Sequence, residues 1–437
     1  MRGQRGALKF PPARRFRRIR PASAPAPRTL FFSLLPARLS HLSKHTHHSH
    51  ITTMADHDHH HHDHQASWQK LAASSQSDDE QSSPGPRSSH ALVYASPYVY
   101  LLAGERAPRV PVDDQGAVWR IKISDNDAKW ERVVTNGDDA PPPCVAPAAA
   151  AAAVGEGIYL FGGRTAIAME QGVLGDLYRL DTSTLTWTKA WTRPTDSADD
   201  DAPAPRSYHA AASLAGKFYV FGGCGPSGRL NDLWSFDPAA GGKWERLPDP
   251  PQGGKTLPPR GGASLAADER NGRLVVVGGF DGNKELADAH AFDVRARAWC
   301  SGPGGCASCE GAEPTLPARS VLGVAAHTGC GGGGGGGEGE DDDSKCSHVG
   351  HLVAFGGECD PSVTRSHDAA GKFLGDAWCG DGASGAWHPL KTAAGSAAPC
   401  PRGWFASCAV PGGLVLHGGL DASNERLSDC WRLRFGH

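Results

Sequence analysis

Hydrophobic residues recur along this chain in short β-rich runs, and each run is broken by glycine, proline or a small polar cluster. Runs of about four to eight such residues, bounded by turn residues, are typical of β-strands. One larger pattern appears six times. A hydrophobic run ends in a pair of small residues, a step of Leu, Asp and an aromatic residue follows, and a lone Trp comes after it.

The six small pairs set the length of the repeat. They are Ala103-Gly104, Gly162-Gly163, Gly222-Gly223, Gly278-Gly279, Gly356-Gly357 and Gly418-Gly419. Their second glycines follow one another at 59, 60, 56, 78 and 62 residues. A repeat of this length predicts an all-β fold in which one four-stranded unit is arranged radially six times, a six-bladed β-propeller.

The lone Trp residues predict how the ring closes. Five units carry one on the fourth strand, at Trp130, Trp187, Trp244, Trp299 and Trp387, where we expect packing between blades. The sixth unit ends without one, and Trp68 precedes the first unit. We therefore expect the N-terminal strand to complete the last blade and remove an exposed sheet edge. The predicted propeller comprises residues 67–437.

Residues 1–66 are predicted to be a disordered N-terminal extension. Residues 1–53 hold 11 Lys and Arg and no acidic residue, which is typical of a transit peptide. Met54 offers an alternative start, in which case the upstream stretch is an artefact of gene modelling. We expect a cytoplasmic protein, or a plastid or mitochondrial one if residues 1–53 are a transit peptide. The His-rich tract at 57–64 is expected to be disordered without a dedicated metal role.

Composition excludes some partners. The net charge of −3 gives no reason to expect nucleic acid or an anionic membrane, and no apolar run is long enough to cross a bilayer. The 12 cysteines are scattered, which favours reduced thiols over a disulfide framework. Cys300, Cys306 and Cys309 suggest a structural zinc, but a Gly-rich acidic insertion at 331–343 separates Cys330 from Cys346. The sequence does not indicate an oligomeric state.

Arginine recurs where the chain enters the first strand of a unit. Five of the six units have it, at Arg87, Arg206, Arg260, Arg319 and Arg402. These loops open on the same face of a propeller as the loops after the second strands, so convergent guanidinium groups predict an anionic ligand, either a small molecule or an acidic peptide. The alternative is that these arginines bind neighbouring loop carbonyls and stabilise the ring.

The loop of the fifth unit offers a second kind of chemistry. Glu358, Asp360 and His367 lie within ten residues of one another. Two carboxylates and one histidine match the ligand set that holds non-haem Fe(II) with open positions, although spacing within a loop is a weak constraint. If the loop binds a metal ion, these three residues are its predicted ligands.

The repeats resemble kelch repeats throughout residues 67–437, and several stretches resemble the plant nitrile-specifier and epithiospecifier-like proteins. These stretches include Arg87-Ser88-Ser89-His90, Arg206-Ser207-Tyr208-His209, Gly356-Gly357-Glu358, Arg402-Gly403-Trp404 and His417-Gly418-Gly419. The resemblance implies iron-dependent diversion of glucosinolate aglucones to nitriles. It also implies a Glu-x-x-x-Asp-x-x-x-His ligand set, from which this chain departs, because Ser362 stands at the Asp position and His367 lies one residue late.

Two functions follow from these observations. In the first, Fe(II) held by Glu358, His367 and Asp360 contacts the aglucone sulfur, the arginines bind its sulfate, and Trp404 lines the pocket. In the second, the chain is a non-enzymatic scaffold whose arginine-rich mouth binds an acidic peptide or a partner protein.

Overall fold

The computed structural model describes residues 66–72, 82–114, 117–123, 128–152, 157–165, 172–194, 201–250, 257–300, 316–326, 352–360, 371–380, 386–392 and 395–435. Within these ranges the chain forms 28 strands and no helix, and accordingly no helix that could span a membrane. The His-rich tract, the Gly-rich acidic insertion and His367 lie outside them, as do all the cysteines of the suggested zinc cluster except Cys300.

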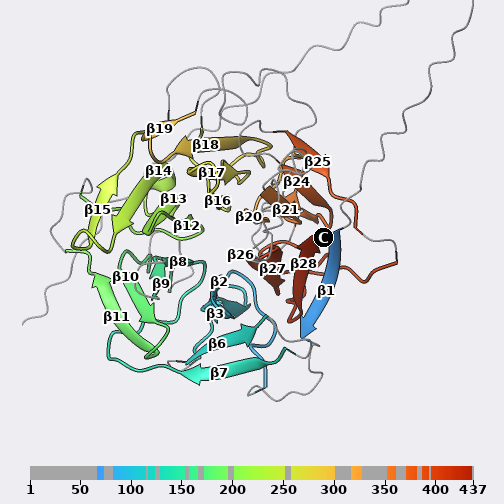
Figure 1. The fold of residues 1–437 in the computed structure, drawn as a ribbon, viewed down its shortest axis with the longest axis horizontal. Coiled ribbons are helices and arrows are strands. Elements are labelled where there is room, and N and C mark those ends of the chain that lie inside the picture. Colours follow the sequence, from blue (N-terminus) through green and yellow to red (C-terminus); the bar gives the residue numbers. More distant parts are fainter. Residues whose placement is uncertain are drawn as a thin grey trace, which may run out of the picture. The chain divides into compact units, whose positions relative to one another are not determined.

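Six antiparallel four-stranded sheets are arranged around one axis (Figure 1). Blade one contains β2 (Ala91–Ala95), β3 (Tyr98–Leu102), β6 (Ala117–Lys122) and β7 (Trp130–Val134). Blade two contains β8 (Ala148–Ala152), β9 (Gly157–Phe161), β10 (Leu177–Asp181) and β11 (Thr186–Trp191). Blade three contains β12 (Ala210–Leu214), β13 (Lys217–Gly225), β14 (Gly228–Asp237) and β15 (Lys243–Arg246).

The second half of the ring repeats this order. Blade four contains β16 (Ser264–Asp268), β17 (Arg273–Val277), β18 (Ala289–Asp293) and β19 (Ala298–Trp299). Blade five contains β20 (Gly323–Ala326), β21 (Leu352–Phe355), β24 (Ala377–Gly380) and β25 (Trp387–Pro389). Blade six contains β26 (Ala406–Val410), β27 (Gly413–His417), β28 (Cys430–Phe435) and β1 (Ala66–Ala72). Two small hairpins, β4 (Glu105–Ala107) with β5 (Val110–Pro111) and β22 (Glu358–Cys359) with β23 (Lys372–Phe373), project from blades one and five.

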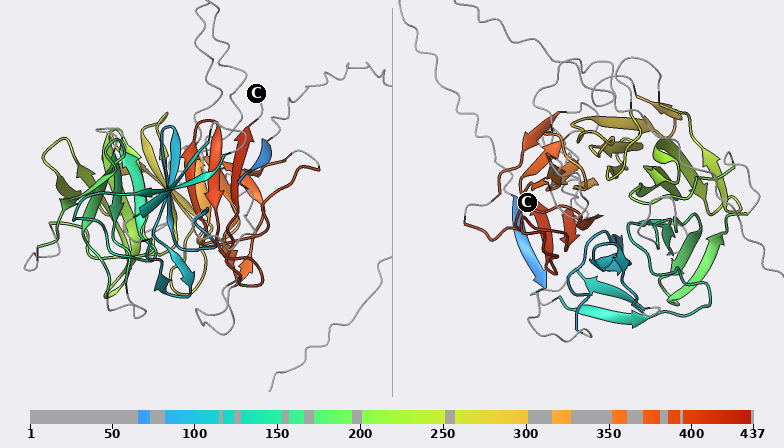
Figure 2. Two further views of the ribbon diagram at one scale, coloured as in Figure 1. Left: turned by 90° about the horizontal axis from the view of Figure 1, so that it is seen from below. Right: turned by 180° about the vertical axis from the view of Figure 1, so that it is seen from behind.

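The ring closes as the sequence predicts. Strand β1 pairs antiparallel with β28, so that Ala66 faces Phe435 and Trp68 faces Leu433. The first and last described strands thus lie side by side in one blade (Figure 2). The six-bladed all-β propeller and its closure by the N-terminal strand are both confirmed.

Each fourth-strand Trp packs against the preceding blade, which confirms the predicted role of these residues. Six hydrophobic clusters fill the six interfaces between blades. Trp244 of blade three, for example, contacts Phe161 of blade two with ring centroids 5.2 Å apart. Trp68 makes the equivalent contact with Phe355 of blade five at 4.9 Å. The core is therefore a ring of interfaces rather than one central cluster.

The small pairs sit where the second strand turns away from the axis. Both residues of each pair have positive φ, from 59° to 66° at the first position and from 94° to 106° at the second. Ala103 adopts the first of these conformations, with φ 61°, although it carries a side chain. Glycine is favoured here because a side chain in this region of φ clashes with the backbone.

Three histidines are buried between blades. His417 Nδ1 lies 3.1 Å from His90 Nε2 across the interface of blades six and one, and His209 packs edge-on against Phe161. Burial, together with nearby arginines, lowers the pKa of His209 and of His417 to about 3 and lowers that of His90 well below its ordinary value. All three are therefore neutral in the folded protein at neutral pH.

We expect the free energy of unfolding to fall as the pH drops below 6.5. In this range the unfolded histidines gain protons that the folded ones exclude, at about 1.4 kcal/mol per histidine per pH unit. Urea unfolding at pH 7.5 and pH 5 measures the effect. The variant His209→Phe copies Phe405, which stands at the equivalent position of blade six. Its free energy of unfolding should fall less between pH 7.5 and pH 5, by the contribution of one histidine. Equal stability of the native chain at both pH values would contradict the prediction.

Candidate functional site

Six backbone hydrogen bonds close a ring around the axis at one mouth of the channel. Each blade contributes the second residue after its arginine position, and each N–H donates to the carbonyl of the corresponding residue in the preceding blade. The bonds run from Ser89 to Trp404 (2.9 Å), Ala146 to Ser89 (2.8 Å), Tyr208 to Ala146 (3.1 Å), Gly262 to Tyr208 (2.9 Å), Val321 to Gly262 (2.7 Å) and Trp404 to Val321 (3.3 Å).

The same six residues share a left-handed backbone, with φ between 47° and 64°. Such a conformation is uncommon for residues with a side chain, and for Val and Trp it is a strained one. The bond to the neighbouring blade holds each residue in it. The ring thus fixes six side-chain positions at the mouth.

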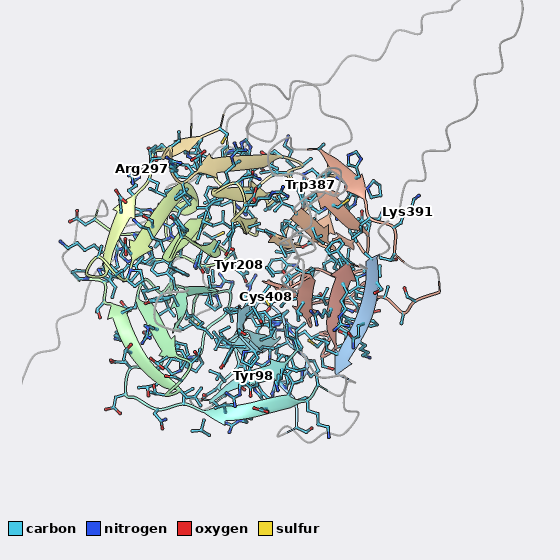
Figure 3. All side chains as sticks on the ribbon, viewed as in Figure 1. Tyr98, Tyr208, Arg297, Trp387, Lys391 and Cys408 are labelled. Atoms are coloured by element: carbon cyan, nitrogen blue, oxygen red, sulfur yellow. The ribbon has the colours of Figure 1, made fainter. Side chains whose placement is uncertain are left out.

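Two aromatic side chains meet across this ring. Tyr208 belongs to blade three and Trp404 to blade six, which stand opposite each other in a ring of six. Their ring centroids are 5.5 Å apart in an edge-on arrangement. Figure 3 places Tyr208 at the inner end of its blade, close to the axis. The pair therefore spans the mouth, and both residues are half-buried.

A second set of residues surrounds the first. In every blade the residue after the small pair forms an antiparallel bridge with the residue after the arginine position. These six residues are Glu105, Arg164, Cys224, Phe280, Glu358 and Leu420. The loops before the first strands and after the second strands thus open on one face, as expected from the propeller geometry.

The five arginines do not face the mouth, and the prediction that they bind a ligand is wrong. All five side chains are fully buried, at 0% exposed. Each pairs with an aspartate of its own blade that lies on the third strand (Asp232) or one to three residues before it, and each donates to the carbonyl of the first residue of the small pair. The aspartates, in order, are Asp114, Asp232, Asp288, Asp376 and Asp429.

Blade three shows the geometry. Arg206 donates from Nη1 and Nη2 to the two oxygens of Asp232 at 2.7 and 2.8 Å, and from Nη1 to the Gly222 carbonyl at 3.0 Å. Although burial raises the pKa of Asp232, the hydrogen bonds and charge of Arg206 lower it below its usual value. A guanidinium with its donors satisfied inside the blade is a structural group. The alternative stated above, that these arginines stabilise the ring, is the one that holds.

Glu358 and Trp404, by contrast, meet at the mouth. Trp404 Nε1 donates to Glu358 Oε2 at 2.9 Å, and the Gly371 N–H donates to Oε1 at 2.6 Å. The carboxylate is buried, at 8% exposed, and both of its oxygens accept hydrogen bonds from the protein. The hydrogen bond from Trp404 Nε1 to Glu358 orients the indole ring beside Tyr208.

The predicted metal ligands come together only in part. Asp360 is exposed, lies two residues beyond Glu358 and has φ 53°. His367 lies outside the described residues. Within the part of the chain that the structure describes, no three His, Cys, Asp or Glu side chains are close enough to hold a metal ion. These residues therefore do not make up an iron site by themselves.

The mouth is acidic on the side of blades four and five. Burial raises the pKa of Glu285, and the negative charges of Glu358 and Asp360 raise it further. Glu285 is held in the blade-four loop, where it forms a bridge with Phe280. Glu285 thus lies near two further carboxylates, one of which, Glu358, accepts the Trp404 indole N–H.

The opposite side carries cations. The guanidinium of Arg164 lies 5.2 Å from the ring centroid of Tyr208, a cation–π arrangement. Burial raises the pKa of Tyr208, whereas the charges of Arg164 and Arg109 oppose that rise. The Glu105 carboxylate lies on this side too, where it accepts the Arg109 N–H and pairs with Arg426 of blade six at 3.1 Å. The side of blades one and two therefore carries the Arg164 guanidinium and the paired Glu105 carboxylate, and the Tyr208–Trp404 pair lies between this side and the carboxylates of blades four and five.

Sequence reasoning missed Tyr208, Arg164, Arg109 and Glu285 as candidate site residues. Tyr208 and Arg164 occupy positions that recur in every blade, namely two residues after the arginine position and directly after the small pair. The signal available was that these recurring positions vary in chemistry from blade to blade, whereas the arginine position and the first position of the small pair each depart from Arg or Gly in only one blade. A repeated residue in a propeller supports the repeat, whereas a residue unique to one blade is free to serve a site.

Several known proteins resemble this chain over 60% to 80% of its length. A model of the KLHDC2/KLHL20/DRC7 Kelch-repeats domain matches residues 89–328. The N-(sulfonatooxy)prop-2-enimidothioate sulfolyase of Thlaspi arvense is 26% identical over 80% of this chain and 92% of its own. The leucine-zipper-like transcriptional regulator 1 homolog of Drosophila melanogaster is 22% identical over 80% of this chain and 31% of its own length. Acyl-CoA-binding domain-containing protein 4 of Arabidopsis thaliana is 26% identical over 60% of this chain and 35% of its own length.

Proposed function

Because this chain belongs to the kelch-repeat family and is 26% identical to a sulfolyase over 80% of its own length, we propose that it is a specifier-type kelch protein. Its substrate would be a glucosinolate aglucone, an N-sulfonatooxy imidothioate, which it would direct to a nitrile. The observation that carries this proposal is the aromatic pair at the mouth, in which the Arg164 guanidinium lies against Tyr208 and the Glu358 carboxylate accepts the Trp404 indole N–H.

The Arg164 side of the mouth suits the sulfate of such a substrate. Arg164 is buried, at 3% exposed, and lies against Tyr208, so that a sulfate beside it would be held in surroundings of low polarity. Guanidinium groups bind tetrahedral oxyanions through paired donors and stay charged when buried. The half-buried rings of Tyr208 and Trp404 would pack against the apolar side chain of the aglucone.

The reaction balances without an oxidant. The N–O bond breaks and its electron pair leaves with sulfate, while the C–S bond breaks and its electron pair forms the third bond between carbon and nitrogen. The products are a nitrile, sulfate and one sulfur atom at the zero oxidation state. A guanidinium at the sulfate stabilises the charge that develops on the leaving group. Arg164 is the residue to which we assign that role.

Iron stays a prediction from the resemblance alone. A bound ferrous ion would supply an acceptor for the departing sulfur. The described residues offer Glu358 and Asp360 but not a third ligand, and Glu358 already accepts two hydrogen bonds. We therefore derive no step of the reaction through the metal.

An assay of product ratios tests the proposal. The full chain is incubated with myrosinase and allylglucosinolate, with and without Fe(II), and nitrile is measured against isothiocyanate. We expect the chain to raise the nitrile fraction, and we expect Arg164→Met to lower that gain by about tenfold or more because it removes a charge-assisted contact to sulfate.

The exposed Glu131→Gln on β7 serves as the control and should leave the product ratio unchanged. A nitrile fraction that the chain does not alter, with and without Fe(II), would sink the proposal. The scaffold alternative rested on the five blade arginines, which are buried, so an acidic peptide would instead have to bind Arg164 at the mouth.

A further inference from the structure

At four of the six blade interfaces, the fourth-strand Trp packs edge-on against a ring of the preceding blade. The ring belongs to the residue directly before the small pair. The two ring centroids are 5.2 Å apart for Phe161 and Trp244, 6.1 Å for Phe221 and Trp299, 4.9 Å for Phe355 and Trp68, and 5.3 Å for His417 and Trp130. Edge-on contact is an arrangement that aromatic rings favour, so each of these rings holds its Trp in place.

The interface between blades four and five has no ring at this position, but a leucine compensates. Val277 precedes the small pair there, and Leu316 belongs to the same buried cluster as Val277 and Trp387. Leu316 lies three residues before Arg319, where the chain enters blade five. Leu257 takes the equivalent place between blades three and four. A large side chain therefore fills each of these interfaces, from one position or the other.

The interface between blades one and two has neither of these groups. Leu102 precedes the small pair, and Pro141 stands three residues before Cys144, which occupies the arginine position of blade two. Leu102 and Trp187 belong to one buried cluster, but Trp187 forms no ring pair with any residue that the structure describes. The space that a Phe, a His or an entering Leu fills at the other interfaces is therefore not filled in the same way here.

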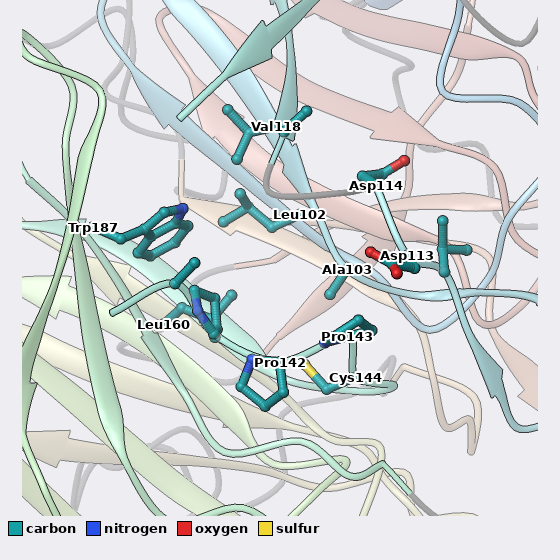
Figure 4. Close-up of a pocket in the computed structure, with 14 residues that line it drawn as sticks. Leu102, Ala103, Asp113, Asp114, Val118, Pro142, Pro143, Cys144, Leu160 and Trp187 are labelled. Atoms are coloured by element: carbon teal, nitrogen blue, oxygen red, sulfur yellow. The ribbon is translucent and has the colours of Figure 1, made fainter. Parts of the chain in front are cut away.

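A cavity of about 110 Å³ lies at this interface (Figure 4). Its apolar lining comes from both blades and comprises Leu102, Val118, Leu160, Trp187 and the prolines at 141–143. The thiol of Cys144 forms part of the wall, and burial raises its pKa to about 12, so that it is uncharged at neutral pH. Asp113 and Asp114 lie at the edge, which reaches solvent because Asp113 is exposed. Since an engineered apolar cavity of about 150 Å³ holds benzene, this one has room for at most one small ring.

We propose that this cavity binds a small uncharged monocyclic aromatic compound, whose ring packs against Trp187 as Phe161 and Phe221 pack against their own Trp residues. The apolar walls disfavour a charged ring, because a charge loses its hydration there without gaining a partner. The carboxylates of Asp113 and Asp114 at the edge repel an anion in particular. The cavity shares no residue with the channel mouth, so the inference does not rest on the proposed function.

Calorimetry and thermal unfolding of the full chain with phenol test the inference. We expect saturable binding and a rise in Tm that saturates with it, because phenol binds only the folded state. Cyclohexanol carries the same hydroxyl on a thicker ring without a π system, and it should bind more weakly by about tenfold or more. Benzoate has the aromatic ring together with a negative charge, and we expect it not to bind.

Filling the cavity from the chain itself is the decisive control. Leu102→Phe copies the ring of the other blades, and we expect it to raise Tm and abolish phenol binding. Pro141→Leu copies Leu257 and should weaken phenol binding by about tenfold or more, so it decides the matter if the Leu102 variant does not fold. The inference is overturned if phenol fails to saturate the native chain, or if cyclohexanol or benzoate binds as tightly as phenol. It is also overturned if phenol binds either folded variant as tightly as it binds the native chain.

Discussion

Replacing Arg206 by methionine is expected to lower the free energy of unfolding by about 3–5 kcal/mol, the cost of removing one partner from a buried ion pair. Methionine fills a similar length but leaves the Asp232 carboxylate without its two guanidinium contacts and the Gly222 carbonyl without its donor. The urea midpoint of unfolding, monitored by tryptophan fluorescence, measures the loss.

Arg297→Met is the matched control. Arg297 pairs with Glu245 at 2.8 Å in much the same geometry, but the two side chains are 48% and 47% exposed. Exposed pairs contribute about 0–1 kcal/mol, so this variant should unfold close to the native midpoint. If the two variants lost equal stability, burial of Arg206 would not be the reason for its effect. If Arg206→Met retained native stability and lost ligand binding instead, the result would assign Arg206 to ligand binding at the mouth.

Replacing Gly223 by alanine should cost about 3–4 kcal/mol. Its φ of 97° is strained for any residue with a side chain, and the new methyl group would lie 2.6 Å from His209 Cβ and 2.8 Å from the Ser207 carbonyl. Both atoms belong to the segment that enters the blade, so neither can move without disturbing the ring of hydrogen bonds. Thermal and urea unfolding of the purified variant provide the measurement.

Gly241→Ala separates the two causes. Gly241 has φ 82° in the turn before β15, and a methyl group there would meet no atom within 4 Å. This variant should therefore lose only the conformational part, about 1–2 kcal/mol. A Gly223 variant no less stable than the Gly241 variant would show that the close approach to His209 is relieved at little cost.

The fold was predictable because its signals are local and repeated. Each small pair requires positive φ, each lone Trp lies at a blade interface, and both occur six times if Trp68 is counted. A pattern that recurs at a regular interval averages out the ambiguity of any one strand. The displaced Trp68 even predicted the pairing of β1 with β28.

The site was harder, because the sequence does not tell which direction a side chain takes from a loop. The blade arginines and Tyr208 lie two residues apart in the same segment, yet Arg206 turns into the blade and Tyr208 faces the axis. The left-handed φ at Tyr208 produces this change of direction. The sequence gives no sign of this left-handed φ, because five of the six residues that adopt it in the hydrogen-bonded ring are not glycine.

The candidate metal ligands illustrate a different limit. Glu358 was correctly placed at the mouth, but its partners in the structure are Trp404 and the Gly371 N–H. Those bonds join segments that are far apart in the chain or separated by a loop. The residue types were visible in the sequence, whereas the contacts that decide their chemistry were not.

The pairing of β1 with β28 also bears on how the protein is made. Strand β1 leaves the ribosome before any other strand of the propeller. Its partner β28 is the last strand of the propeller to emerge, so Ala66 cannot pair with Phe435 until then. Blades one to five can form in order as they leave the ribosome, each against the one before. Blade six cannot, so the ring closes only after β28 has left the ribosome. Until then β1 has no strand to pair with, and Trp68 and Phe355 lack the contact that they make in the closed ring.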